Sequence, residues 1–72
     1  MDRVAVISSS LSEVGYDPSE HRLEIRFRSG GTYEYYNVPL HVYEALLNAP
    51  SKGSYFQRRI RNRYRTRRVR AS

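Results

Sequence analysis

The sequence contains no cysteine, only two histidines, and no acidic residue after Glu44. The absence of cysteine excludes disulfides and thiolate metal sites. The first ten residues, MDRVAVISSS, contain no long apolar run behind a basic flank, so neither a signal peptide nor a membrane-spanning segment is expected. These absences favour a soluble, cytoplasmic protein that does not associate with membranes.

No pattern of catalytic or metal-binding residues is visible either. His21 is expected beside a turn and His41 in the first turn of a helix, while the serine run at 8–10 has no base partner in view. Asp17 and Glu20 are explained by a turn. A nucleophile, a base and an orienting group must converge in space, and two histidines with scattered acids lack metal-ligand spacing. We therefore predict that the protein is not an enzyme and has no cofactor, metal or small-molecule substrate.

Charge is sorted along the chain. Residues 1–50 carry four arginines against seven acids, a net charge of −3, whereas residues 51–72 carry Lys52 and eight arginines against no acid, a net charge of +9. Arginine is favoured where planar guanidinium groups bind phosphates or carboxylates or stack on aromatic rings. A GC-rich genome also raises arginine content, but it does not sort acids into one half. The segregation therefore indicates an anionic partner.

Alternation of apolar and charged residues predicts antiparallel strands in the first half. Leu23, Ile25 and Phe27 alternate with charged residues, which is the period of a half-buried strand. DPSE at 17–20 and SGG at 29–31 are turn sequences, because proline presets φ, aspartate hydrogen-bonds the following backbone, and glycine accepts positive φ. The expected strands are 14–16, 22–28 and 32–36, with 3–8 either as a fourth strand or as cover for an edge.

The pattern becomes helical at Pro39. Apolar residues recur at i, i+3 and i+4 over 39–48, and Pro50 ends the segment. A second helix is predicted over about 53–64, with Ser51 or Ser54 as its N-cap. Its buried stripe is expected to consist of Phe56, Ile60 and Tyr64.

Together these segments predict one small α+β domain over residues 1–65. It would be a three-stranded, or four-stranded, antiparallel meander followed by two α-helices packed on one face. Residues 66–72 contain one apolar anchor, Val69, among arginines, and like charges at that density resist packing. They are predicted to form a mobile basic tail.

Four stretches resemble the KTSC family: SSSLSEVGYDP, LEIRFRSGGTYEYYNVP, VYEALLNAPSKGSYFQRRIRNRY and a closing RV. That family comprises small bacterial and phage proteins and a similar module at the C-terminus of some lysyl-tRNA synthetases. The likeness runs from about residue 3 to residue 69. It implies a small α+β domain whose role is mostly unassigned. It also suggests RNA binding, from the synthetases, or a regulator that binds host RNA polymerase, from the phage members.

The tyrosines of the third strand allow two interpretations. Tyr33 and Tyr35 share one face, and we interpret them mainly as the roof of a small core, since a tyrosine hydroxyl can reach water from a half-buried site. The alternative is a platform that stacks unpaired bases. Tyr36 is expected to face away from the core, with Arg26 or Arg28 across the hairpin, and is therefore the best candidate for stacking.

The leading hypothesis is a non-enzymatic module that associates with RNA or DNA phosphates through an arginine-rich second helix and tail. The simplest alternative is a solvated helix face with a disordered end, and another is a tethering piece with no partner. A further alternative is a phage-type transcription regulator that docks on an acidic protein such as RNA polymerase. A membrane-surface helix is disfavoured, because its apolar stripe is needed by the core. The predicted binding residues are Lys52, Arg58, Arg59, Arg61, Arg63, Arg65, Arg67, Arg68, Arg70 and Tyr36.

Overall fold

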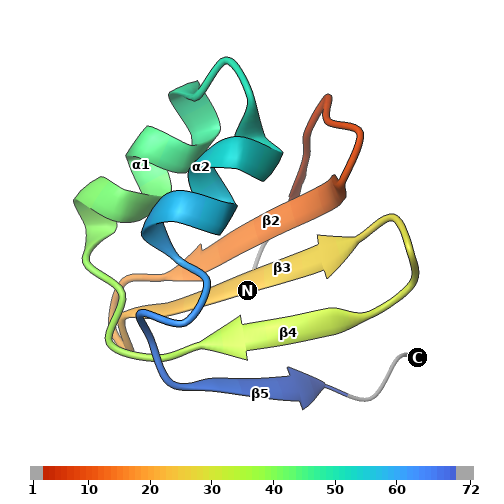
Figure 1. Ribbon diagram of the computed structural model, residues 1–72. Helices are drawn as coiled ribbons and strands as arrows, with labels where there is room; N and C mark the ends of the chain where they lie inside the picture. Colours follow the sequence, from red (N-terminus) through yellow and green to blue (C-terminus); the bar gives the residue numbers. More distant parts are fainter. Residues whose placement is uncertain (1–2, 70–72) are drawn as a thin grey trace.

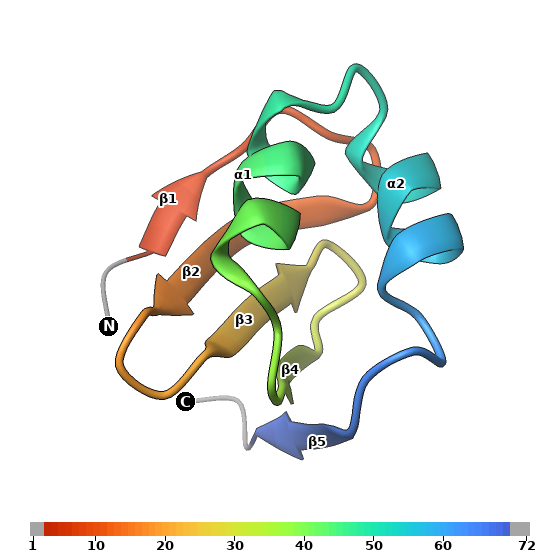
Figure 2. The same cartoon turned by 90° about the vertical axis from the view of Figure 1, so that its left-hand side faces the viewer.

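A five-stranded antiparallel sheet, whose strands lie in the order of the chain, is the frame of the protein (Figure 1). The computed structural model describes residues 3–69. Two helices stand between the fourth and fifth strands in the chain and cover one face of the sheet (Figure 2). The predicted α+β class is therefore confirmed. The elements are β1 (Arg3–Ala5), β2 (Leu11–Asp17), β3 (Arg22–Phe27), β4 (Thr32–Tyr35), α1 (Leu40–Asn48), α2 (Lys52–Arg59) and β5 (Thr66–Val69).

The sheet has five strands, so the prediction of three or four was wrong. At one edge β1 pairs with β2, with Val4 opposite Val14. At the other edge residues 66–69, predicted to belong to a mobile tail, form β5 and pair with β4 from Thr66 opposite Tyr35 to Val69 opposite Thr32. The side-chain pattern of TRRV gives no sign of this pairing, because the ladder is made by backbone groups at the outer edge of β4. Residues 70–72 of the predicted tail lie outside the described residues.

The core lies between the sheet and the two helices. Tyr35 is almost fully buried, and the Phe56 ring of α2 stands edge-on to Tyr35 and Phe27, with ring centroids 5.7 Å and 5.2 Å apart. Tyr33 packs edge-on to Phe27 at 5.7 Å. The interpretation of Tyr33 and Tyr35 as the roof of the core is therefore right. The buried apolar residues are Leu11, Val14, Leu23, Ile25, Tyr35, Val38, Val42, Leu46, Phe56 and Ile60.

The second helix is shorter than the sequence predicts. It begins as expected, because the Ser51 hydroxyl accepts a hydrogen bond from the Ser54 amide at 3.3 Å. It ends at Arg59 rather than near 64. In the turn that follows, Asn62 adopts a left-handed conformation with φ of 63°, which asparagine tolerates and through which a helix cannot continue. Ile60 is nevertheless fully buried and Tyr64 half-buried, so the apolar stripe docks even though its end is a turn.

The turn between β2 and β3 is built by one carboxylate. Oδ1 of Asp17 accepts hydrogen bonds from the Ser19 hydroxyl at 2.7 Å and from the amides of Ser19 and Glu20 at 3.0 and 3.3 Å. Arg22 lies 3.8 Å from the other oxygen. These contacts, the Ser19 hydroxyl first, lower the pKa of Asp17. The carboxylate thereby closes the first hairpin, as the sequence predicts.

This turn makes stability depend on pH. Because the folded-state pKa of Asp17 is lowered, its carboxylate stabilises the protein above the unfolded-state pKa of about 3.9, and that contribution is lost as the pH falls. Asp17→Asn should lower the urea midpoint at neutral pH, and the deficit should shrink between about pH 5 and 2. Glu20→Gln in the same turn is the matched control. A deficit that is constant with pH would contradict this account.

If residues 66–69 form a strand rather than a mobile tail, their removal should lower the stability of the protein. A chain ended after Arg65 loses the β4–β5 ladder and the hydrogen bond from the Thr66 hydroxyl to the Glu34 carbonyl at 2.9 Å. We expect its unfolding free energy to fall by about 1–3 kcal/mol. A chain ended after Val69 is the control and should keep wild-type stability in urea unfolding followed by circular dichroism. Equal stability of both truncated chains would mean that β5 contributes nothing.

Candidate nucleic-acid interface

Charged side chains on the face of the sheet that the helices leave uncovered pair with one another. A row of residues opposite one another crosses the sheet here, from Glu24 on β3 to Glu34 on β4 and Arg67 on β5. Four of the seven acidic residues of the chain are held in ion pairs on this face. This face is therefore nearly neutral. Its ion pairs are Arg3 with Glu24 and Glu13, Arg22 with Asp17 and Glu34, and Arg67 with Glu34.

Tyr36 lies on the same face, just beyond β4. Its hydroxyl donates a hydrogen bond to Oε1 of Glu34 at 2.9 Å, and this bond raises the pKa of Tyr36. The side chain lines an open hollow of about 520 Å³ together with Asn37, Arg65, Thr66 and Arg67. The sequence predicts Arg26 or Arg28 as its neighbours, which is wrong, because Arg26 lies opposite Thr32 at the start of β4, whereas Tyr36 follows the end of β4 and has Arg65 and Arg67 beside it.

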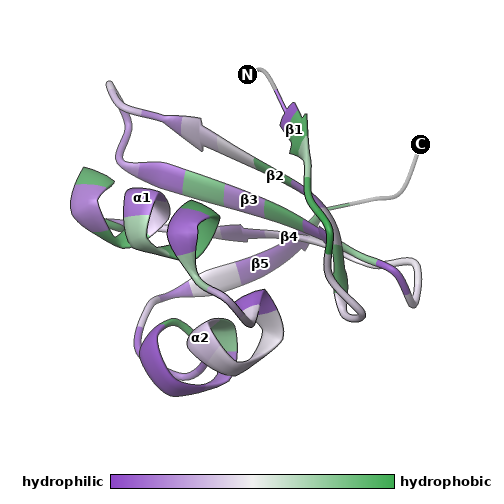
Figure 3. Cartoon of the chain, turned by 90° about the horizontal axis from the view of Figure 1, so that it is seen from above, coloured by the Kyte–Doolittle hydropathy of each residue, from purple (hydrophilic) through white to green (hydrophobic). Residues whose placement is uncertain are grey.

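The arginines of the second helix and the turn after it form a separate group. Arg58, Arg59, Arg61 and Arg63 are all exposed, and among residues 3–69 none of them is within ion-pair distance of a carboxylate. Two of them are held in place: Arg61 donates to Oε1 of Gln57 at 2.9 Å, and Nε of Arg63 donates to the Arg58 carbonyl at 3.0 Å. Figure 3 shows the hydrophilic outer side of α2 turned away from the sheet. We call these four residues the α2 arginine group.

The predicted arginine surface is thus divided by the sheet. Side chains alternate along β5, so Arg68 lies opposite Tyr33 on the helix-bearing face, with its guanidinium carbon 6.0 Å from the ring centroid, while Arg67 points to the uncovered face. Arg65 sits at the bend before β5, and its carbonyl accepts the Tyr36 amide at 2.9 Å. The α2 arginine group and Arg68 therefore share one side, and Arg65, Arg67 and Tyr36 the other. Arg70 lies outside the described residues.

Lys52 does not belong to either group. It is the first residue of α2, at the opposite end of the helix from Arg59, and eight residues of helix span about 12 Å. Its ammonium donates to the Ala49 carbonyl at 3.0 Å and is partly buried. The side chain therefore closes the connection between the two helices, and its predicted place in a phosphate-binding surface is not supported by the geometry.

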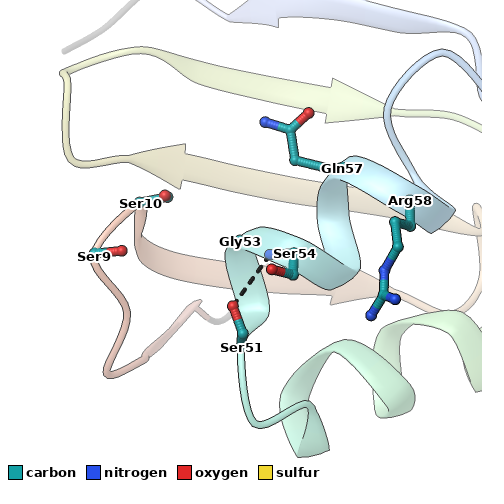
Figure 4. A pocket seen from close by; sticks show the side chains of 7 residues that line it. All are labelled: Ser9, Ser10, Ser51, Gly53, Ser54, Gln57 and Arg58. Atoms are coloured by element: carbon teal, nitrogen blue, oxygen red, sulfur yellow. Dashed lines mark hydrogen bonds between the residues drawn. The ribbon is translucent and has the colours of Figure 1, made fainter.

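Serines surround the N-terminal end of α2 (Figure 4). Ser9 and Ser10 from the β1–β2 loop face Ser51 and Ser54 across an open hollow of about 480 Å³, which Gln57 and Arg58 also line. Gly53 allows this approach, because a Cβ there would stand 3.1 Å from the Ser10 hydroxyl. The serines thus serve the packing of loop against helix. Within residues 3–69 there is no group of three potential metal ligands, and no helix there is long and apolar enough to cross a membrane.

A groove between the two helices combines the predicted Arg59 and Arg63 with Tyr55, which the sequence reasoning did not assign to a site. It is an open hollow of about 360 Å³ in which Tyr55 and Tyr64 lie with Arg59 and Arg63. The spacing of four residues from Tyr55 to Arg59 is a signal in the sequence, since residues four apart share one side of a helix. Arg63 lies in the turn after α2, so its place in the groove does not follow from helical spacing. The contribution of α1 to the groove depends on how the helices pack, which the spacing does not reveal. The remaining lining residues are His41 and Val42.

Comparison with known proteins identifies the fold and the family. Residues 7–64 match the model of the KTSC domain, which stops just before β5. A crystal structure of a KTSC domain protein from Yersinia pestis superposes with a TM-score of 0.94 at 38% identity, covering 96% of this chain and 97% of that one.

Two further relatives differ in length. An uncharacterized protein from Stutzerimonas stutzeri is 52% identical over 56 residues, which is 78% of this chain and 79% of the relative. A lysine–tRNA ligase from a Nostoc species is 48% identical over 57 residues, or 79% of this chain but 10% of the ligase. The chain therefore corresponds to about a tenth of that larger protein. Since the domain model covers most of the chain, and a relative of similar length is more than half identical, the chain belongs to the KTSC domain family.

Proposed function

We propose that this protein is a non-enzymatic cytoplasmic module that binds nucleic-acid phosphates through the α2 arginine group. The observation that supports this most is the sorting of charge by face. Acids and arginines neutralise one another on the uncovered face of the sheet, whereas the four exposed arginines at the end of α2 have no carboxylate partner within residues 3–69. Guanidinium groups without an internal counterion are suited to phosphate oxygens.

The placement of the α2 arginine group favours contacts with the phosphates of a nucleic acid over sequence-specific contacts with the bases of a duplex. The four arginines stand on one short helix and the turn that follows it, so several phosphates can be neutralised together. Phosphate contacts position a protein and carry no sequence information. The similar segment within a protein named lysine–tRNA ligase agrees with an RNA partner, and DNA phosphates have the same chemistry.

Charge removal on α2 tests this proposal. A variant with Arg58, Arg59, Arg61 and Arg63 all changed to Gln should bind RNA and DNA more weakly. Its plot of log K against log salt concentration should also be flatter, by up to about 0.9 per lost contact for duplex DNA. Fluorescence anisotropy with labelled oligonucleotides at several salt concentrations measures both quantities. Circular dichroism checks the fold, which should survive because all four side chains are exposed.

A charge-matched control keeps this test specific. Arg26→Gln removes one exposed arginine from the uncovered face of the sheet, and Arg58→Gln removes one from the α2 arginine group. We expect the salt slope to change for Arg58→Gln and to stay at the wild-type value for Arg26→Gln. Equal effects of the two single variants would mean that only net charge matters, and unchanged affinity in the fourfold variant would reject the proposal.

A second candidate function is docking on an acidic protein, for instance as a phage-type transcription regulator on RNA polymerase. The observation in its favour is that β1 and β5 are the two edges of the sheet, since an edge strand can pair with an extended segment of another chain. Affinity capture from bacterial lysate, with and without nuclease, separates the two functions. Nucleic acid that disappears on digestion supports phosphate binding, whereas one stoichiometric polypeptide that survives digestion supports protein docking.

A further inference from the structure

The groove between α1 and α2 combines aromatic rings with arginines that have no carboxylate partner within residues 3–69. Tyr55 and Tyr64 are half-buried and the nearly buried Val42 also lines the hollow, while Arg59 and Arg63 are exposed in it. The hollow measures about 360 Å³, within the range of about 300–1,000 Å³ that is usual for small-ligand sites. No lining residue is acidic. A flat ring next to a negatively charged group would match this composition.

The position of Arg63 favours a built site over chance exposure. Its Nε is fixed on the Arg58 carbonyl at 3.0 Å, which holds the guanidinium at the end of α2 and leaves its other N–H groups available. Tyr55 and Arg59 are one helical turn apart on α2, so their side chains lie on the same side of the helix. A ring on Tyr55 and a phosphate on Arg59 would thus be neighbours, as a base and its phosphate are in one nucleotide.

We infer that this groove accepts one unpaired nucleobase with its phosphate, so that the preferred ligand is single-stranded nucleic acid. The inference rests on the proposed function and specifies its substrate class. Bases in a duplex are stacked and paired, whereas an unpaired base can turn outward and stack on an aromatic side chain. The α2 arginine group then follows the backbone on either side of the inserted base, since Arg59 and Arg63 belong to both the groove and the group.

The hollow beside Tyr36 is a weaker candidate for the same ligand. Its tyrosine hydroxyl is bonded to the Glu34 carboxylate, and Arg67 is already paired with that carboxylate at 3.5 Å. A phosphate there would meet a negative charge, whereas a phosphate in the helix groove would not. The two hollows therefore provide a natural pair for comparison, with Tyr36→Leu as the matched control for Tyr55→Leu.

Anisotropy measurements with labelled oligouridylate, oligodeoxythymidylate and a duplex of equal length test the inference. We expect Tyr55→Leu to weaken binding to single strands about tenfold, while duplex binding changes less than about twofold and Tyr55→Phe, which keeps the ring, stays near wild type. Tyr36→Leu should leave all affinities unchanged. The oligouridylate and oligodeoxythymidylate arms show whether RNA or DNA is the ligand. A loss that is equal for duplex and single strands, or that occurs only with Tyr36→Leu, would overturn the inference.

A second measurement needs no variant and so does not depend on folding. Photo-crosslinking of the wild-type protein to an oligonucleotide with one 4-thiouridine, mapped by peptide mass spectrometry, should mark Tyr55, Tyr64 or His41. Crosslinks confined to Tyr36 would overturn the proposed site. Binding that fails for every oligonucleotide at low salt rejects the proposed function itself, whereas salt-dependent binding without crosslinks in the groove rejects only the inference.

Discussion

Packing of both helices on one face of the sheet is the constraint on which the rest of the structure depends. Because side chains alternate along a strand, covering one face forces the other to stay in contact with water. The residues on that second face are charged, and opposite charges on neighbouring strands lie close enough to pair, as in Arg67 with Glu34 and Arg22 with Asp17. These pairs use four of the seven acids of the chain, so the charge left over is positive, and four of the remaining arginines form the α2 arginine group on the helix side.

Glu34 makes more of the contacts on the uncovered face than any other acidic residue described. It accepts the Tyr36 hydroxyl, pairs with Arg22 and Arg67, and its backbone carbonyl accepts the Thr66 hydroxyl. One residue in the fourth strand thereby holds the Arg67 and Tyr36 side chains on the uncovered face and contacts the start of the fifth strand through Thr66. The α2 arginine group has no such partner within the described residues. The two groups of arginines look alike in the sequence, but only the α2 arginine group is left without a carboxylate and is suited to an anionic ligand.

The arginines of β5 have a structural role as well. An edge strand exposes backbone groups that could pair with another chain, and charged side chains on such a strand oppose that pairing. The sequence TRRV places one arginine on each face of the edge, Arg67 toward Glu34 and Arg68 toward the ring of Tyr33. The same charge density that suggests a mobile tail is therefore compatible with a strand, since the two exposed arginines find partners on opposite faces of the sheet while the backbone pairs with β4.

The sequence by itself determined the features that depend on neighbours along the chain. The alternation of Leu23, Ile25 and Phe27, the turn built on Asp17, a serine cap on the second helix and the sorting of charge all follow from local patterns. Three features were decided only by tertiary structure: the pairing of residues 66–69 with β4, the end of α2 at Arg59, and the groove that brings Tyr55 and Tyr64 beside α1. Each of the three depends either on contacts between segments distant in the chain or on one backbone conformation. Such contacts and conformations leave no periodic pattern in the order of side chains.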